Sequence, residues 1–155
     1  MVDTAYDERF MKIAIKEAQK CKHGMEQFPI GAVVVKNGEI ISRGHSKDKH
    51  TNNPTDHAEI IALIKACKKL GRQTLSDCTL FSTAEPCQMC LSVIFQTRVQ
   101  EIVYGAPREK LPMRKKSITI EHLLKDAGYE VLLTAGVLES KCLALFRQRK
   151  LLPKK

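Results

Sequence analysis

Residues 78–104 combine strand and helix signals in an order that restricts the fold to the layered α/β classes. Cys78–Thr83 is a short apolar strand, Pro86 stands at the predicted first position of a helix, and Glu101–Tyr104 is a second strand that Gly105 ends. A strand, a helix and a strand within about 30 residues form a right-handed parallel crossover. We therefore expect an α/β protein, a three-layer α/β/α sandwich around a central mixed sheet.

The segments on either side of this crossover supply the other expected elements. Residues 31–44, GAVVVKNGEIISRG, carry two β-branched runs around Asn37-Gly38, the dipeptide that best tolerates the positive φ angles of a two-residue hairpin turn. No repeat or linker interrupts the pattern, so residues 1–155 are expected to form a single domain. The periodicity further predicts helices over 7–24, 56–71, 118–127 and 138–150, a strand over 130–133, and loops over 45–55 and 107–116.

The composition narrows the class of protein and its location. The chain has 26 basic and 17 acidic residues, a formal charge of +9, and 43% hydrophobic residues. This composition fits a folded domain. The sequence has no apolar run of roughly 18 residues that would span a membrane. The first residues lack a signal-peptide pattern, so we expect a cytoplasmic protein with mostly reduced cysteines. The positive charge favours a polyanionic partner such as nucleic acid without requiring one.

Two short motifs carry the residues best suited to bind a metal ion. His57-Ala58-Glu59 opens one predicted helix, and Pro86-Cys87-Gln88-Met89-Cys90 opens another. A Cys-x-x-Cys pair at a helix start places both thiols on one face, where the helix dipole lowers their pKa. An imidazole and two thiolates suit zinc, and three protein ligands leave a position for water. We therefore expect His57, Cys87 and Cys90 to bind Zn²⁺, with Glu59 moving protons beside the bound water.

The same residues also allow simpler interpretations. Asp56 and Glu59 have the spacing of a helix capping box, in which Glu59 only accepts from a backbone N–H. A closed structural zinc site with Cys67 or Cys78 as fourth ligand, or a thiol redox pair, is the alternative for the cysteines. A basic nucleic-acid-binding module with structural zinc and no catalysis is the alternative from another class of protein.

The paired motifs resemble those of the zinc-dependent cytidine and deoxycytidylate deaminase superfamily. The likeness runs from about Phe10 to Phe146. It implies hydrolytic deamination, in which zinc-activated water attacks the carbon that bears an exocyclic amine, Glu59 transfers protons, and ammonia leaves. Members commonly pair through the helices beside the zinc motif, so the resemblance also implies a homodimer.

The order of elements resembles the purine-type branch of this superfamily, which includes guanine deaminases and bacterial tRNA adenosine deaminases. Phe28-Pro29-Ile30-Gly31-Ala32 resembles a strand start that lines the base pocket, where Phe28 can stack on a planar ring. Gly44-His45-Ser46 stands where Gly-x-Asn is common, so Ser46 replaces an amide that contacts the base edge. The resemblance thus implies substrate contacts at Phe28, Ser46 and Ala58.

These features lead to an expected substrate and a rival. We expect removal of the exocyclic amine of a nucleobase or nucleoside, with a purine such as guanine favoured. The alternative is a tRNA adenosine deaminase that makes inosine at the wobble position. In that case the basic residues of 108–116 and of the tail after Arg147 would contact phosphates.

Overall fold

A computed structural model describes residues 3–113 and 120–153 of the chain. Residues 114–119, which include part of the predicted basic loop and the start of the helix predicted over 118–127, lie outside the described residues. The elements follow one another as α1 (Thr4–Gln19), β1 (Gly31–Lys36), β2 (Glu39–His45), α2 (Asp48–Thr51), α3 (Ala58–Leu70), β3 (Thr79–Ala84), α4 (Gln88–Thr97), β4 (Glu101–Ala106), the 3-10 turn η1 (Arg108–Lys110), α5 (Ile120–Asp126), β5 (Leu132–Thr134) and α6 (Glu139–Gln148).

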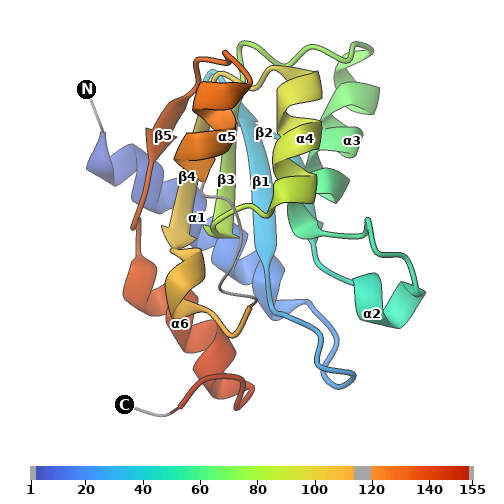
Figure 1. Cartoon of the computed structure of the whole chain (residues 1–155), viewed down its shortest axis with the longest axis vertical. Coiled ribbons are helices and arrows are strands. Elements are labelled where there is room, and N and C mark those ends of the chain that lie inside the picture. The colour runs from blue at the N-terminus through green and yellow to red at the C-terminus, as the bar shows by residue number, and fades with distance from the viewer. Residues whose placement is uncertain (1–2, 114–119, 154–155) are drawn as a thin grey trace.

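The strands form one mixed sheet in the order β2-β1-β3-β4-β5. Strand β1 is antiparallel to both β2 and β3, whereas β3, β4 and β5 run parallel. Helices α3, α4 and α5 lie on one face of the sheet, and α1 and α6 lie on the other (Figure 1). The expected crossover and the three-layer sandwich are both confirmed.

The hairpin β1–β2 turns where the sequence predicts. Asn37 has φ 49° and Gly38 has φ 75°, the positive values that a two-residue turn requires. Strand β1 lies between β2 and β3 with helices on both faces, and its residues from Ala32 to Val35 are fully buried. Burial on both faces explains why this strand is continuously apolar rather than alternating.

Several element boundaries differ from the predicted ones. Helix α1 ends at Gln19 rather than near Gly24, and the short helix α2 occupies part of the predicted loop over 45–55. The prediction that Pro86 is the first helical residue is wrong, because Cys87 is the N-cap of α4. The chain stays extended there since the Glu85 N–H still donates to Ala106 O, at 2.9 Å, and prolongs the contact between β3 and β4.

Strand β2 and helix α3 are joined by close backbone packing. A Cβ added at Gly44 would lie 2.5 Å from Ala58 O and 2.9 Å from Ala62 N, so only glycine fits this approach. The Ser42 hydroxyl donates to Ala62 O at 2.6 Å in the same contact. These contacts fix the position of the first turn of α3 against the sheet. Among the described residues, none of the helices has the length and apolar character needed to cross a membrane.

Candidate active site

Helices α3 and α4 begin side by side and bring the three predicted metal ligands together. His57 is the N-cap of α3 and Cys87 that of α4, and neither side chain caps its helix. Cys87 Sγ lies 3.6 Å from His57 Nδ1 and 3.6 Å from Cys90 Sγ, and Cys90 Sγ lies 3.6 Å from His57 Nδ1. Tetrahedral ligands about 2.0–2.3 Å from zinc stand roughly 3.5 Å apart. The three donor atoms therefore have the chemistry and the spacing of a zinc site.

No fourth protein ligand joins this group among residues 3–113 and 120–153. The two cysteines considered for that role are engaged elsewhere: Cys67 Sγ donates to Gln73 O and Cys78 Sγ to Asp77 Oδ1. The geometry therefore favours an open site over a closed structural one. All six cysteines are free; Cys21, Cys78 and Cys142 are buried, whereas Cys67 is only partly buried.

Glu59 lies against the metal ligands and is only 2% exposed. Its Oε1 accepts from the Ser82 hydroxyl at 3.1 Å, and its Oε2 accepts from Cys90 Sγ at 3.6 Å. The capping-box interpretation is wrong, because His57 is the N-cap and the Asp56 carboxylate accepts instead from Thr51 and Asn53. Burial, and next the charge of Cys87, raises the pKa of Glu59. A carboxyl group with a raised pKa is suited to accept and return a proton near neutral pH.

The two thiols of the site have opposite pKa shifts. The hydrogen bond with Cys90, opposed by burial and reinforced by His57, lowers the pKa of Cys87 to about 3. The same bond, together with burial, raises the pKa of Cys90. One thiolate is thus available to a metal ion at neutral pH, and the other thiol must release its proton when the metal binds.

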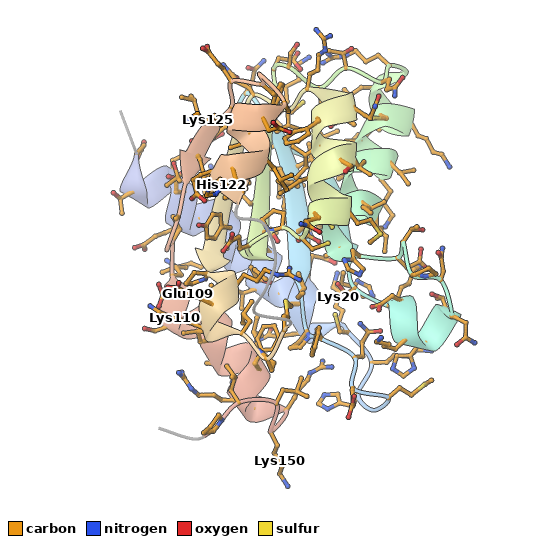
Figure 2. The ribbon with its side chains drawn as sticks, viewed as in Figure 1. Lys20, Glu109, Lys110, His122, Lys125 and Lys150 are labelled. Atoms are coloured by element: carbon orange, nitrogen blue, oxygen red, sulfur yellow. The ribbon has the colours of Figure 1, made fainter. Side chains whose placement is uncertain are left out.

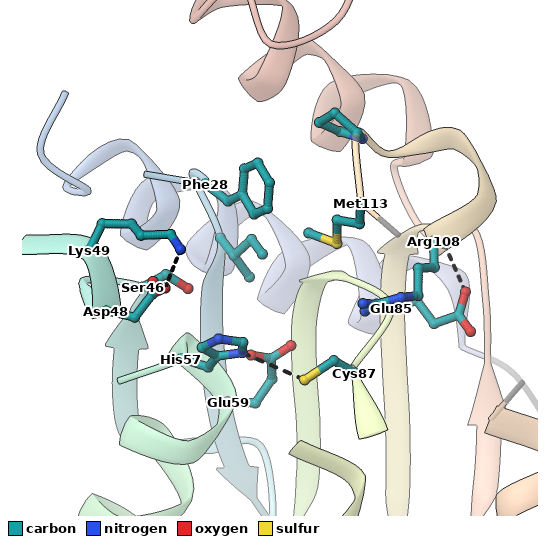
Figure 3. Close-up of a pocket in the computed structure, with 12 residues that line it drawn as sticks. Phe28, Ser46, Asp48, Lys49, His57, Glu59, Glu85, Cys87, Arg108 and Met113 are labelled. Atoms are coloured by element: carbon teal, nitrogen blue, oxygen red, sulfur yellow. Dashed lines mark hydrogen bonds and ion pairs between the residues drawn. The ribbon is translucent and has the colours of Figure 1, made fainter. Parts of the chain in front are cut away.

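A cavity of about 440 Å³ opens above the ligands (Figure 3). Phe28 and Ser46 line it as expected, whereas Ala58 does not. Ala58 is buried, and its N–H donates to Ser46 Oγ at 3.2 Å, which ties the start of α3 to the cavity wall. The lining residues are Phe28, Ile30, Ser46, Asp48, Lys49, His57, Glu59, Glu85, Cys87, Arg108, Pro112 and Met113.

Four charged cavity residues were not predicted as such from the sequence. Asp48, Lys49 and Glu85 were not singled out, and Arg108 was expected to contact phosphates of a tRNA, whereas its side chain lines the cavity. One available signal was the end of strand β4: parallel strands β3 and β4 finish at the same edge of the sheet, so the residues after each strand lie together. Glu85 and Arg108 occupy those two places.

The family follows from a comparison of the sequence with known families. Residues 4–106 match the family described as the cytidine and deoxycytidylate deaminase zinc-binding region. The chain belongs to this family. It is therefore a zinc-dependent deaminase, and His57, Cys87 and Cys90 are the residues positioned to hold the ion. Because members of this family are enzymes, family membership argues against the alternative of a non-catalytic module with structural zinc.

The deaminase is similar to proteins of both subtypes that the sequence resembles. It is 41% identical over 138 residues to the tRNA-specific adenosine deaminase of Bacillus subtilis, covering 88% of this chain and 83% of the relative. It is 42% identical over 99 residues to the guanine deaminase of the same organism, covering 64% of each. A solved structure from a study of tRNA A34 deaminases at the wobble position superposes with a TM-score of 0.74 at 29% identity, covering 88% of this chain and 98% of that one.

Proposed function

We propose that this deaminase removes the exocyclic amine of a purine, and that its preferred substrate is guanine as the free base or nucleoside. The charge of the cavity carries this proposal. Asp48 and Glu85 line the wall together with Glu59, and the Lys49 ammonium lies 3.9 Å from the Asp48 carboxylate. Apart from Arg108, the charged groups on the wall are acidic or paired, which suits a neutral base better than a chain of phosphates.

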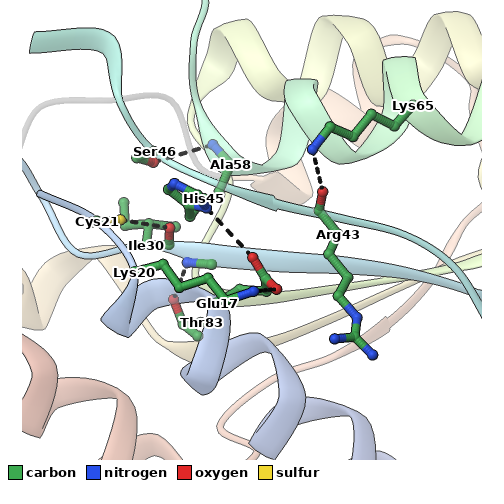
Figure 4. A network of polar contacts seen from close by, with 11 residues as sticks. Glu17, Lys20, Cys21, Ile30, Arg43, His45, Ser46, Ala58, Lys65 and Thr83 are labelled. Carbon is green, nitrogen blue, oxygen red and sulfur yellow. Dashed lines mark hydrogen bonds and ion pairs between the residues drawn. The ribbon is translucent and has the colours of Figure 1, made fainter. Parts of the chain in front are cut away.

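Much of the basic charge lies away from this cavity. Lys20, Arg43, Lys65 and Lys69 line a separate groove beside strand β2. There Lys65 Nζ donates to Arg43 O at 3.1 Å, and Lys20 pairs with the buried Glu17 at 2.6 Å (Figure 4). Figure 2 shows Lys125 and Lys150 near opposite ends of the molecule. In the described part of the chain, the basic side chains named here are therefore not gathered at the catalytic cavity.

The proposed base-binding contacts are an aromatic face and a hydroxyl group. The ring centroids of Phe28 and Phe146 lie 5.9 Å apart, and this packing holds Phe28 at the cavity wall. From there the Phe28 ring can stack on a purine. Ser46 offers its hydroxyl hydrogen to the base, because the hydroxyl oxygen already accepts from the Ala58 N–H. Ala58 accordingly acts by positioning Ser46.

Glu59 is the proposed catalytic residue. When bound, zinc supplies water whose pKa is lowered to roughly 7. Glu59 accepts a proton from this water and passes it to a ring nitrogen of the base. The oxygen of that water forms a bond to the amine-bearing carbon, and Glu59 carries the remaining proton of this oxygen to the amine, which leaves as the C–N bond breaks. The net reaction consumes one water molecule, converts the C–NH₂ group to a carbonyl, and releases ammonia.

The test is a turnover screen of the zinc-loaded protein with guanine, guanosine, adenine, adenosine, cytosine, cytidine and tRNA. We expect ammonia release to be fastest with guanine or guanosine. Its rate should stay nearly constant when the salt concentration is raised from about 50 to about 200 mM. Release from cytosine or cytidine alone would contradict the proposed purine preference.

Deamination of adenosine in tRNA is the second candidate. The 41% identity to a tRNA-specific adenosine deaminase extends over 88% of this chain and so includes much of the C-terminal part. A polyanionic substrate loses affinity steeply as salt rises, because each phosphate contact releases counterions. Inosine formation in tRNA with such a salt dependence, and no ammonia from guanine, would favour this candidate.

We also propose that the protein is a cytoplasmic, single-domain enzyme that pairs as a homodimer through α3 and α4. Ile64 on α3 is 46% exposed, and Met89 and Val93 on α4 are only partly buried. The six free thiols suit a reducing compartment. Light scattering should give the mass of a dimer for the native protein, and Ile64→Lys should shift it toward the monomer.

A further inference from the structure

Arg108 places a guanidinium group in the catalytic cavity without a protein partner. Its Nε is buried and makes no hydrogen bond, and Arg108 forms no ion pair within the described parts of the chain. Figure 3 shows the side chain extending into the cavity between Met113 and Cys87. An unpaired buried donor costs free energy that a ligand carrying an acceptor can recover.

The backbone around Arg108 holds this side chain in place. The Glu85 N–H donates to Ala106 O at 2.9 Å, and the Arg108 N–H donates to Glu85 Oε2 at 2.8 Å. The Glu85 carboxylate is thus occupied by the main chain of Arg108. Since Cys87 follows two residues after Glu85, these bonds also fix Arg108 relative to the metal ligands.

We infer that Arg108 recognises the O6 and N7 acceptors of a 6-oxopurine, and so selects guanine over adenine. This inference rests on the proposed purine deamination. A guanidinium donates through a planar fork that matches two neighbouring acceptors, and guanine presents O6 and N7 in that arrangement. Adenine offers N7 beside an amino group. This amino group is a donor like the guanidinium, so the two groups repel each other instead of forming a hydrogen bond. An isolated lysine would distinguish the two bases less well, because it is a point charge.

The chemistry of guanine deamination is compatible with this contact. The amine that leaves is attached to C2 of guanine, on the part of the ring remote from the O6 and N7 edge. A base with C2 at the metal therefore keeps that edge free for a donor on the cavity wall. Phe28, on the wall of the same cavity, can stack on the face of the ring.

The experiment compares Arg108→Met with the zinc-loaded native protein on two ligands. Guanine and 2-aminopurine, which lacks O6 but keeps N7 and the 2-amine, are both followed as substrates by ammonia release. We expect kcat/KM for guanine to fall about 10- to 100-fold, the range of one bidentate contact. The kcat/KM for 2-aminopurine should fall much less. Zinc content and thermal unfolding should be unchanged, since the bond to Glu85 uses the Arg108 backbone.

Two further variants sharpen the comparison. Lys110→Met removes a cation from the same turn, but Lys110 pairs with Glu139 at 2.6 Å and does not line the cavity, so the guanine to 2-aminopurine preference should stay at the native value. Arg108→Lys keeps the charge without the planar fork and should recover only part of the loss. Full recovery with lysine would overturn the inference, because charge alone would then suffice.

The remaining outcomes separate this inference from the proposed function. Equal losses for guanine and 2-aminopurine, or a larger loss for guanosine monophosphate than for guanine, would overturn the Arg108 contact while leaving purine deamination intact. The second of these results would assign Arg108 to a phosphate. A native protein that releases no ammonia from guanine would overturn both proposals.

Discussion

The Ser82 hydroxyl on strand β3 donates to Glu59 Oε1 on helix α3 at 3.1 Å. This bond connects the middle layer of the fold to the carboxylate beside the metal ligands. It holds one oxygen of Glu59 with a neutral donor and leaves the other against Cys90 Sγ. In the described structure, Glu59 is therefore held by a neutral hydroxyl group rather than by a lysine or arginine side chain.

Replacement of Glu59 by glutamine should separate catalysis from metal binding. Glu59→Gln keeps the size of the side chain but cannot accept a proton, so kcat should fall about 10³-fold or more while zinc stays stoichiometric. Steady-state kinetics and metal analysis measure the two effects. Glu101→Gln is the control and should retain activity, because Glu101 is the first residue of β4, whereas Arg108 and the cavity follow the other end of that strand. Loss of zinc from Glu59→Gln would make Glu59 a structural residue instead.

Removal of either thiol ligand should remove the metal and loosen the helix starts. Cys87→Ala and Cys90→Ala each leave two ligands, so zinc should be lost and the melting temperature lowered, because metal binding and local folding are coupled. Cys67→Ala is the matched control, since Cys67 bonds only to Gln73 O and should keep stoichiometric zinc. Stoichiometric zinc in the Cys87→Ala or Cys90→Ala variant would contradict the assignment of that cysteine as a ligand.

The close approach of Gly44 to α3 predicts an effect of the hairpin on the metal site. Gly44→Ala forces a Cβ against Ala58 O and should cost about 1–3 kcal/mol of stability by overpacking. It should also weaken zinc binding, because the displaced turn contains Glu59 and follows His57. Gly38→Ala provides the comparison: Gly38 has φ 75° but open space around it, so stability should fall while zinc affinity stays constant. Calorimetry with zinc titration measures both quantities.

The buried thiol of Cys142 predicts a loss of stability at alkaline pH. Burial raises the pKa of Cys142 to about 12, from an ordinary value of 9.0. Between these values the unfolded chain loses a proton that the folded chain keeps, so the free energy of unfolding falls as pH rises, by at most about 1.4 kcal/mol per pH unit. Denaturant titrations from pH 8 to 11 should therefore show a smaller decline for Cys142→Ala than for the native protein. Parallel declines would contradict this prediction.

Local rules explain which parts of the fold could be predicted from the sequence. Asn37-Gly38 specifies its turn by backbone sterics alone, and the two motifs at His57 and Cys87 carry ligand chemistry that few other patterns share. Helix boundaries were less predictable because long-range bonds decide them. The start of α4 depends on the bond between Glu85 and Ala106, which are 21 positions apart and brought together only by the pairing of β3 with β4.

The cavity was harder to predict than the metal ligands for the same reason. Phe28 and Ser46 were expected from a family resemblance and do line it. Arg108 and Asp48 belong to segments with no periodicity, where charge pattern indicates only a solvated surface. Their position in the cavity depends on where β4 and β2 end relative to their neighbours, so it follows from strand pairing rather than from the charge pattern of their own segments.

The metal ligands and the proposed selecting residue lie in consecutive, non-overlapping stretches of the chain. His57, Glu59, Ser82, Cys87 and Cys90 all precede residue 91, whereas Arg108 and Met113 follow the next strand. Changes to the later stretch can therefore alter which base is accepted without disturbing the groups that activate water. This separation along the chain allows the substrate preference to change while the catalytic residues stay the same. Residues 107–113 are therefore the segment to randomise when a new specificity is sought.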